Sequence, residues 1–550
     1  MTSITQCRTS LFCFATLLVA ACSAPPAQNE KPKQNEKMEN LVASSREAKA
    51  SAPYIVAAAP VSAARMPDHR MMMPPVQSTE RYGQITDNPV KLVAENPVST
   101  FSIDVDTGSY SNVRRMLNHG KLPPSDAVRV EELIKYCPYD YALPTGKRPF
   151  AVHTEMAPAP WNSERVLLSI GIKGQDVAKH NLPPANLVFL VDVSGSMGSP
   201  DKLPLLQSSL KLLVNQMRAQ DRIALVTYAS GTQVVLPSTS GSEKATINAA
   251  IDALRAGGST AGASGLQLAY SAAQQGFIKN GINRILLATD GDFNVGVSDT
   301  AQLKSMVEEK RKSGISLSTL GFGTGNYNEA MMEQIADVGD GAYSYIDNLM
   351  EGHKVLVNEM TSTLATIARD VKVQIEFNPA VVKEYRQIGY ENRQLKREDF
   401  NNDKVDAGDI GAGHTVTALY ELTLVGAKGS VDPLRYAARV KAASKRSANE
   451  LAFLRLRYKQ PNATTSELIE IPLQRAAIKP LAQTDEDFRF AAAVAGYGQL
   501  LRGGKHTGEW SYADTRRLAG DAIGKDRFGY RGEFLRLVDL AQSFSTAKKP

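Results

Sequence analysis

The chain has 550 residues, of which 43% are hydrophobic, so it can bury more than one apolar core. At roughly 100–200 residues per domain, two to four domains are plausible. The formal net charge of +6 is small and spread over the whole length, which argues against nucleic-acid binding.

The N-terminus has the features of an export signal. A short segment with Arg8 precedes an apolar run that is too short to span a bilayer. The sequence LVAAC (Leu18–Cys22) resembles the lipobox of bacterial lipoproteins, and an ordinary secretory signal with a chance cysteine is the alternative. We expect a signal peptide over residues 1–21 and a lipid anchor on Cys22. By the same resemblance, Ser23 favours a location in the outer membrane facing the periplasm.

Cys137 is the cysteine that remains once the export signal is set aside. The chain has four cysteines, of which two lie in the predicted signal peptide and one is Cys22. An intrachain disulfide is therefore not expected, although the predicted compartment is oxidising. We expect Cys137 to be a small buried side chain.

Residues 22–96 have the composition of a tether. They contain a polar imperfect repeat (QNEKPKQNEK), followed by Ala/Pro-rich and Met-rich stretches. Such a segment cannot bury enough apolar surface to fold, so we predict a disordered tether over 22–96.

Residues 97–185 form a predicted N-terminal flanking domain, and strands then alternate with helices over 186–368. The flank has a short helix in VEELIKYCPYDYALP and a strand at Glu164–Gly174. The strands predicted in the alternating region are continuously apolar, as expected for strands covered on both faces: 186–192, 222–230, 232–237, 283–290, 315–323 and 342–347. The helices predicted between them are 203–217, 243–254, 265–273, 300–312 and 328–338. This alternation predicts an α/β domain with a doubly wound sheet.

Residues 369–550 form a predicted C-terminal domain of β-strands followed by helices. In VKVQIEF (Val371–Phe377) apolar and polar residues alternate, which is typical of a half-buried antiparallel strand. From Thr484 the pattern becomes helical, and Thr484 is a candidate cap for that helix. We infer that the β-rich flanks pair into one β-sandwich-like domain, with the α/β domain inserted between them.

Hard-oxygen side chains gather at the predicted strand ends. Asp192 ends the first central strand, and Ser194 and Ser196 follow on the turn. Thr260 lies in the glycine-rich AGGSTAGASGL, and Asp290 ends a later strand. Ligands of a doubly wound sheet bind outside the carboxyl ends of its strands, and such oxygens suit Mg²⁺ or Ca²⁺.

These residues resemble the metal-ion-dependent adhesion site of the von Willebrand factor type A domain. That motif is D-x-S-x-S, then a Thr after a glycine-rich turn, then an Asp at a later strand end, and all five positions match: Asp192, Ser194, Ser196, Thr260 and Asp290. The resemblance implies that the serines, and often the threonine, ligate the cation directly, whereas the aspartates act largely through bound waters. It also implies that the cation takes a carboxylate from a protein partner as its last ligand.

The flanks carry a second resemblance. STFSIDVDTGSYSNVRRML, EELIKYCPYDY and the segment after Ala368 are similar to the flanks of bacterial von Willebrand factor type A domain lipoproteins of the YfbK-like family. This resemblance runs from about residue 80 to the end of the sequence.

Other interpretations of the same residues are weaker. An EF-hand loop would need Gly at Met197 and Glu at Leu203. The serines could instead merely cap the following helix. VDTGS around Asp106 matches the aspartic-protease signature, but a second such motif in a matching context is missing from the chain, although a homodimer could supply one. G-x-S-x-G, Walker A and H-E-x-x-H motifs are also missing, which argues against the corresponding enzymes and against nucleotide binding.

The sequence thus predicts a non-enzymatic binding module anchored in the cell envelope. Its cation, Mg²⁺ with Ca²⁺ and Mn²⁺ as alternatives, would capture an Asp or Glu side chain of a protein partner. One alternative is an assembly subunit that works with a MoxR- or chelatase-type ATPase, which the lipobox disfavours because ATP is cytoplasmic. The other is a protease acting through Asp106.

Overall fold

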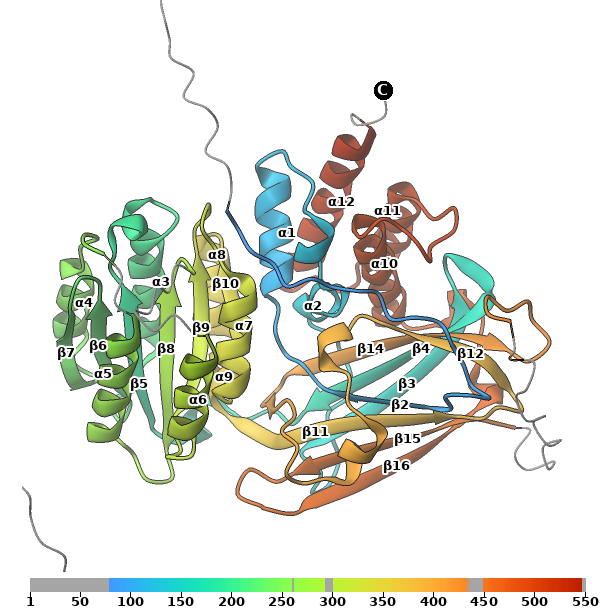
Figure 1. The fold of residues 1–550 in the computed structure, drawn as a ribbon, viewed down its shortest axis with the longest axis horizontal. Helices are drawn as coiled ribbons and strands as arrows, with labels where there is room; N and C mark the ends of the chain where they lie inside the picture. Colours follow the sequence, from blue (N-terminus) through green and yellow to red (C-terminus); the bar gives the residue numbers. More distant parts are fainter. Residues whose placement is uncertain (1–78, 260–261, 292–299, 433, 435–448, 547–550) are drawn as a thin grey trace, which may run out of the picture. The chain divides into compact units, whose positions relative to one another are not determined.

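The structure, a computed structural model, describes residues 79–259, 262–291, 300–432, 434 and 449–546. The predicted signal peptide, Cys22, Thr260 and most of the predicted tether lie outside these residues. The described elements form an α/β domain, a β-sandwich and a layer of helices on the sandwich (Figure 1). No described helix combines the length and the apolar character that a membrane span requires.

The α/β domain contains a six-stranded sheet with the order β10-β9-β8-β5-β6-β7. All neighbouring strands are parallel except β7, which is antiparallel to β6. The strands are β5 (Ala185–Asp192), β6 (Arg222–Tyr228), β7 (Thr232–Ser240), β8 (Ile282–Thr289), β9 (Ser316–Phe322) and β10 (Tyr343–Ile346). The carboxyl ends of the five parallel strands share one edge, which we call the carboxyl edge.

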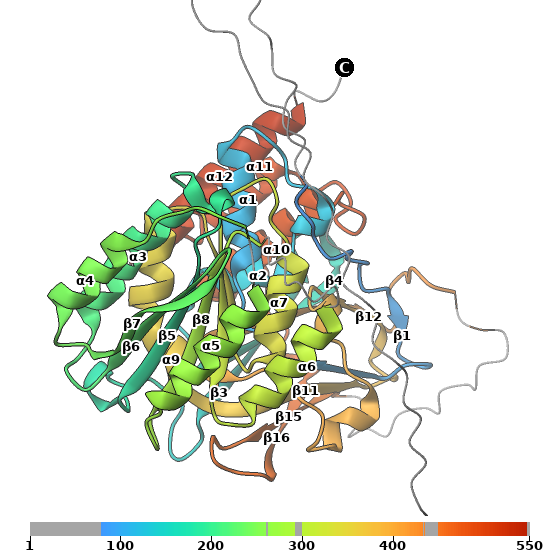
Figure 2. The ribbon, with the colours of Figure 1, turned by 60° about the vertical axis from the view of Figure 1, so that its left-hand side comes forward.

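Helices cover both faces of this sheet, as Figure 2 shows. Along β5, Leu187, Phe189 and Val191 pack toward α3 and α4, whereas Val188 and Leu190 pack toward α5, α6 and α7. The helices are α3 (Leu203–Gln216), α4 (Lys244–Ala253), α5 (Gly262–Gln275), α6 (Thr300–Arg311) and α7 (Glu329–Val338), and two short ones follow β10, α8 (Leu349–His353) and α9 (Met360–Leu364). The predicted doubly wound α/β fold is confirmed, and the apolar run Leu187–Val191 within β5 follows from its burial on both faces.

Strands from both flanks form the β-sandwich. One sheet has the order β1-β12-β14-β4-β3, and the other contains β13, β11, β15 and β16, with β2 also paired to β11. The strands are β1 (Lys91–Leu92), β2 (Val98–Ser102), β3 (Phe150–Ala159), β4 (Asn162–Gly174), β11 (Thr366–Phe377), β12 (Val382–Ile388), β13 (Ile410–Gly411), β14 (Thr415–Leu424), β15 (Glu450–Lys459) and β16 (Ser466–Gln474). The alternating residues of β11, including Val373 and Ile375, face a shared core with Ile170 and Tyr420 of the opposite sheet. The α/β domain is inserted between β4 and β11.

A helical layer covers the outer face of the first sandwich sheet, where Leu167, Ile388 and Leu419 pack against it. Its helices are α1 (Gly108–Asn118), α2 (Val130–Tyr136), α10 (Glu486–Leu501), α11 (Tyr512–Gly520) and α12 (Tyr530–Thr546). The prediction that Thr484 caps a helix is wrong, because its hydroxyl donates to the carbonyl of Leu481, and α10 begins only at Glu486.

Residues 79–96 differ from the predicted tether. β1 pairs with β12 in the sandwich. Thr79–Tyr82, which we call the N-terminal strap, lies along the loop between β9 and α7. The Thr79 N–H donates to the Gly325 carbonyl at 2.7 Å, and the Arg81 N–H donates to the Tyr327 carbonyl at 2.8 Å. Such short pairings leave no periodic pattern in the sequence, so composition alone could not reveal them.

Buried and half-buried ion pairs join α7 of the α/β domain to the flanks. Arg129 contacts Glu333 at 2.7 Å, and Arg393 contacts both Asp337 at 2.7 Å and Asp104 at 3.0 Å. Glu329, at the start of α7, is fully buried, and neither of its carboxylate oxygens accepts a hydrogen bond from a described residue. Burial raises the pKa of Glu329 to about 8, although the nearby Arg129 guanidinium acts in the opposite direction.

We therefore expect stability to fall as pH rises, in part through Glu329. The unfolded chain releases this proton near its usual pKa of 4.5, whereas the folded chain holds it up to about 8, so the free energy of unfolding drops across that window. Between about pH 5 and about pH 8, the free energy of unfolding of Glu329→Gln should fall by on the order of 2–4 kcal/mol less than that of the wild type. Urea denaturation at the two pH values measures this difference. Glu376→Gln, on a half-exposed strand position, is the control and should retain the wild-type pH dependence. An unchanged pH dependence in Glu329→Gln would contradict the assignment.

Candidate metal site at the carboxyl edge

Asp192 lies at the centre of the carboxyl edge, as the last residue of β5, and it is fully buried. One carboxylate oxygen accepts the Ser194 N–H at 2.8 Å. The other accepts the hydroxyls of Thr289 at 2.9 Å and Tyr228 at 3.2 Å. Burial raises the pKa of Asp192, and the charge of Asp290 adds to the rise. Asp192 therefore organises the turn from beneath and does not point into solvent.

Ser194 and Ser196 bring two hydroxyls together above this carboxylate. Their Oγ atoms are 3.1 Å apart, and Ser194 is buried whereas Ser196 is exposed. The turn is fixed to the glycine-rich loop, since the Gly195 N–H donates to the Gly258 carbonyl at 3.0 Å and the Gly257 N–H to the Val193 carbonyl at 2.8 Å. That loop leads to Thr260, whose position lies outside the described residues.

Asp290 follows β8 and reaches the same edge. It is fully buried, and its Oδ2 accepts the Lys202 ammonium at 2.8 Å and the Asn326 side-chain amide at 3.4 Å. Thr289, the residue before it, donates its hydroxyl to Asp192 at 2.9 Å, so the end of β8 is tied to the end of β5 beside Asp290. The structure thus brings together four of the predicted site residues. Sequence reasoning missed Lys202 and Asn326, which occupy a helix start and a loop without any metal-site pattern.

The donor set at this edge fits a hard divalent cation. The groups are hydroxyls and carboxylates, which are the oxygen ligands that Mg²⁺, Ca²⁺ and Mn²⁺ accept. Burial first and the charge of Asp290 second raise the pKa of Asp192, and a divalent cation at this edge would favour the charged form of its carboxyl group. Among the described residues, those of this edge included, no three His, Cys, Asp or Glu side chains gather in a metal-binding group, so the serine hydroxyls are needed to complete the donor set.

Asp106 of the VDTGS motif precedes α1 and contacts none of the predicted metal-site residues among the hydrogen bonds of the described chain. It is buried, and its carboxylate accepts the Tyr343 N–H at 2.8 Å and contacts the Arg393 guanidinium at 3.2 Å. Both interactions join the segment before α1 to neighbouring elements. The carboxylate is therefore engaged in packing contacts between α1, β10 and the sandwich.

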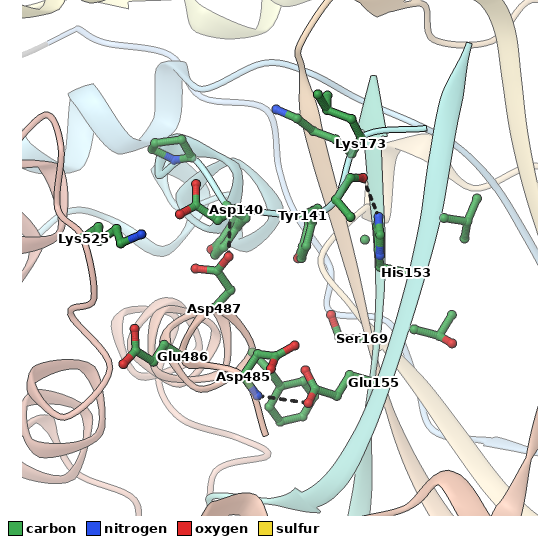
Figure 3. A pocket seen from close by; sticks show the side chains of 18 of the residues that line it. Asp140, Tyr141, His153, Glu155, Ser169, Lys173, Asp485, Glu486, Asp487 and Lys525 are labelled. Atoms are coloured by element: carbon green, nitrogen blue, oxygen red, sulfur yellow. Dashed lines mark hydrogen bonds between the residues drawn. The ribbon is translucent and has the colours of Figure 1, made fainter. Parts of the chain in front are cut away.

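A cleft of about 1440 Å³ lies on the sandwich, between β3, β4, the start of α10 and the loop after α2 (Figure 3). On one wall the rings of Tyr141 and His153 stack with centroids 5.5 Å apart. On the same strand as His153, Glu155 pairs with Lys479 at 2.6 Å. Across the cleft, Asp487 of α10 accepts a backbone N–H of the loop after α2 at 2.6 Å. These carboxylates are engaged with neighbouring groups, so the carboxyl edge of the α/β domain is the stronger candidate site.

Comparisons with known proteins match the flanks as well as the α/β domain. The family described as von Willebrand factor type A domain matches residues 186–358, and the one described as von Willebrand factor matches residues 76–169. The family described as the C-terminal part of the uncharacterized protein YfbK matches residues 362–544. Von Willebrand factor type A domains commonly take part in protein interactions and metal-dependent binding.

Three similar proteins illustrate the range of these matches. Uncharacterized protein YfbK of Escherichia coli K12 is 58% identical over 470 residues, which cover 84% of this chain and 81% of that protein. The magnesium-chelatase 60 kDa subunit of Rhodobacter capsulatus is 29% identical over 168 residues, which cover 30% of this chain and 29% of that protein. A solved von Willebrand factor type A structure from Catenulispora acidiphila is 15% identical and covers 72% of this chain and 91% of that one, with a TM-score of 0.38.

Proposed function

Because this chain belongs to the YfbK family of bacterial von Willebrand factor type A domain proteins, we propose that it is a non-enzymatic protein-binding module. Its carboxyl edge would hold a divalent cation, Mg²⁺ in the first place, and that cation would take a carboxylate from an Asp or Glu of a protein partner. The observation that carries the proposal is the pair of hydroxyls of Ser194 and Ser196, 3.1 Å apart over the buried Asp192.

Each residue of the site has a distinct part in this proposal. Ser194 and Ser196 would ligate the cation through neutral hydroxyls, together with Thr260 as the resemblance implies. Asp192 holds the Ser194 backbone and supplies negative charge from below, and Asp290 supplies charge from the neighbouring strand. When bound, the cation supplies an electrophilic centre, because neutral hydroxyls neutralise less of its charge than carboxylates would. The exposure of Ser196 gives a partner side chain access to it.

The proposal places the protein in the cell envelope, and the lipobox-like segment Leu18–Cys22 supports that location. The alternative, an assembly subunit that works with a chelatase- or MoxR-type ATPase, draws on the similarity of 29% to the magnesium-chelatase subunit over 168 residues. Lipidation at Cys22 would separate the two proposals, because a lipidated protein outside the cytoplasm does not meet cytoplasmic ATP.

Metal-dependent capture from envelope extracts tests the function directly. The full chain, immobilised in detergent, should retain specific proteins in Mg²⁺ and release them in EDTA, because removal of the cation removes the ligand position that the partner carboxylate fills. Modification of carboxyl groups in the extract with a carbodiimide and an amine should abolish retention. Proteins retained equally in Mg²⁺ and EDTA would contradict the proposal.

A further inference from the structure

A side-chain cation of the protein itself lies at the carboxyl edge. The Lys202 ammonium is 2.8 Å from Asp290 Oδ2, and the Lys202 side chain is only 8% exposed. Lys202 directly precedes α3, so its side chain leaves the start of that helix and reaches the end of β8. A lysine at a helix start usually extends into solvent, and this one is buried against a predicted metal-site residue.

The surroundings of Lys202 are shaped to hold it there. Gly323 has φ +72°, and a Cβ at this position would lie 2.3 Å from the Lys202 aliphatic stem. Asn326 stands beside both charged groups, with its Oδ1 3.5 Å from the ammonium and its Nδ2 3.4 Å from Asp290 Oδ2. The loop that carries Gly323 and Asn326 is fixed by the N-terminal strap, since the Gly325 N–H also donates to the Glu80 carboxylate at 3.1 Å. The ammonium therefore has a defined position.

Among the described residues of the predicted site and its lysine neighbour, three side chains carry charge. Asp192 and Asp290 contribute two negative charges, and Lys202 contributes one positive charge. A divalent cation would leave this set with a net positive charge, whereas the same set without the ammonium would be neutral. Like charges repel, so the ammonium lowers the affinity for a cation, and it raises the affinity of the loaded site for an anion.

We propose that Lys202 is a specificity-determining residue that keeps the loaded site net positive, at the expense of metal affinity, and so selects a carboxylate as the partner's ligand. This inference rests on the proposed function, because it concerns the same cation. It assigns to Lys202 two opposite effects: a lower affinity of the site for the cation, and a higher affinity of the loaded site for an anion. A residue that merely held Asp290 in place would affect both in the same direction.

Two variants of the full chain test the charge argument independently. Lys202→Met retains the aliphatic stem and removes the charge, and we expect it to bind Mg²⁺ about tenfold more tightly in calorimetric titration. Asn326→Asp keeps Lys202 but adds a carboxylate at a half-buried position beside it, so it should shift Mg²⁺ affinity in the same direction without leaving Asp290 unpaired. Lys211→Met, on a partly exposed lysine of α3, is the matched control and should bind Mg²⁺ like the wild type.

Acetate represents the carboxylate of the partner and tests the affinity of the loaded site for an anion. With the site loaded with Mn²⁺, paramagnetic broadening of the acetate methyl signal should be weaker in Lys202→Met and Asn326→Asp than in the wild type. Unchanged or weakened Mg²⁺ binding in either folded variant, or unchanged acetate broadening, would overturn the inference while the wild type still bound Mg²⁺. Absence of Mg²⁺ binding by the wild type would overturn the proposed function and the inference together.

Discussion

Replacement of Asp192 by alanine should abolish Mg²⁺ binding, with an affinity loss of at least about 100-fold. The side chain holds the Ser194 N–H at 2.8 Å and provides a buried negative charge directly beneath the two hydroxyls. Without it, the edge keeps neutral donors and Asp290, whose charge is already paired with Lys202. Removing one full charge a few ångströms from a divalent cation accounts for a loss of this size.

Calorimetric titration of Mg²⁺ into EDTA-stripped wild type and Asp192→Ala measures this loss. The fold should survive, because the variant leaves the Thr289 and Tyr228 hydroxyls without this acceptor but also removes a buried carboxylate whose pKa is raised. Thermal unfolding of both proteins checks that point. Asp252→Ala, an exposed aspartate on α4, should titrate like the wild type. Superimposable curves for Asp192→Ala and wild type would show that the metal site is wrongly assigned.

The largest loss of stability should come from Arg114, on α1. Its guanidinium donates to Asp347 at 2.9 Å, to Glu351 at 2.7 Å and to Glu533 at 3.0 Å, and so joins the end of the α/β domain to α12. Asp347 and Glu351 are at most 3% exposed. Arg114→Met would leave their charges buried without this partner, which costs about 3–5 kcal/mol in comparable buried pairs.

Urea denaturation of Arg114→Met measures that loss of stability, and two further variants serve as comparisons. Arg114→Lys keeps the charge but not the forked geometry, so we expect a loss between those of wild type and Arg114→Met. Arg516→Met removes a surface arginine whose partner Asp539 is 54% exposed, and should cost less than about 1 kcal/mol. A midpoint for Arg114→Met equal to that of the wild type would mean that this arginine does not hold the two domains together.

The parts of the fold that were predictable depend on local pattern. The apolar run of β5 marks a strand buried on both faces, and the alternation in β11 marks a sandwich strand, because side-chain burial repeats with the local geometry. The positions Asp192, Ser194 and Ser196 likewise lie within one turn. There the two serine hydroxyls meet, and the Asp192 carboxylate accepts the Ser194 N–H.

The parts that were missed depend on contacts between distant residues. Lys202 and Asp290 are 88 positions apart, and Arg114 and Asp347 are 233 apart, so no spacing in the sequence signals either pair. The same holds for the strap, whose Thr79 lies 246 positions before its partner Gly325. Such pairs are fixed by the assembled fold and become visible only with it.

The N-terminal strap can also transmit force from the N-terminal segment of the chain to the carboxyl edge. Tension applied to the chain ahead of Thr79 would meet the loop at Gly325–Tyr327 first, because the strap is bonded to it through backbone groups and through Glu80. Asn326 in that loop touches both Asp290 and Lys202. A pull on this end of the protein would therefore reach the carboxyl edge through the four residues of the strap. Under the proposed function, force on the chain would then act on the site that holds the partner.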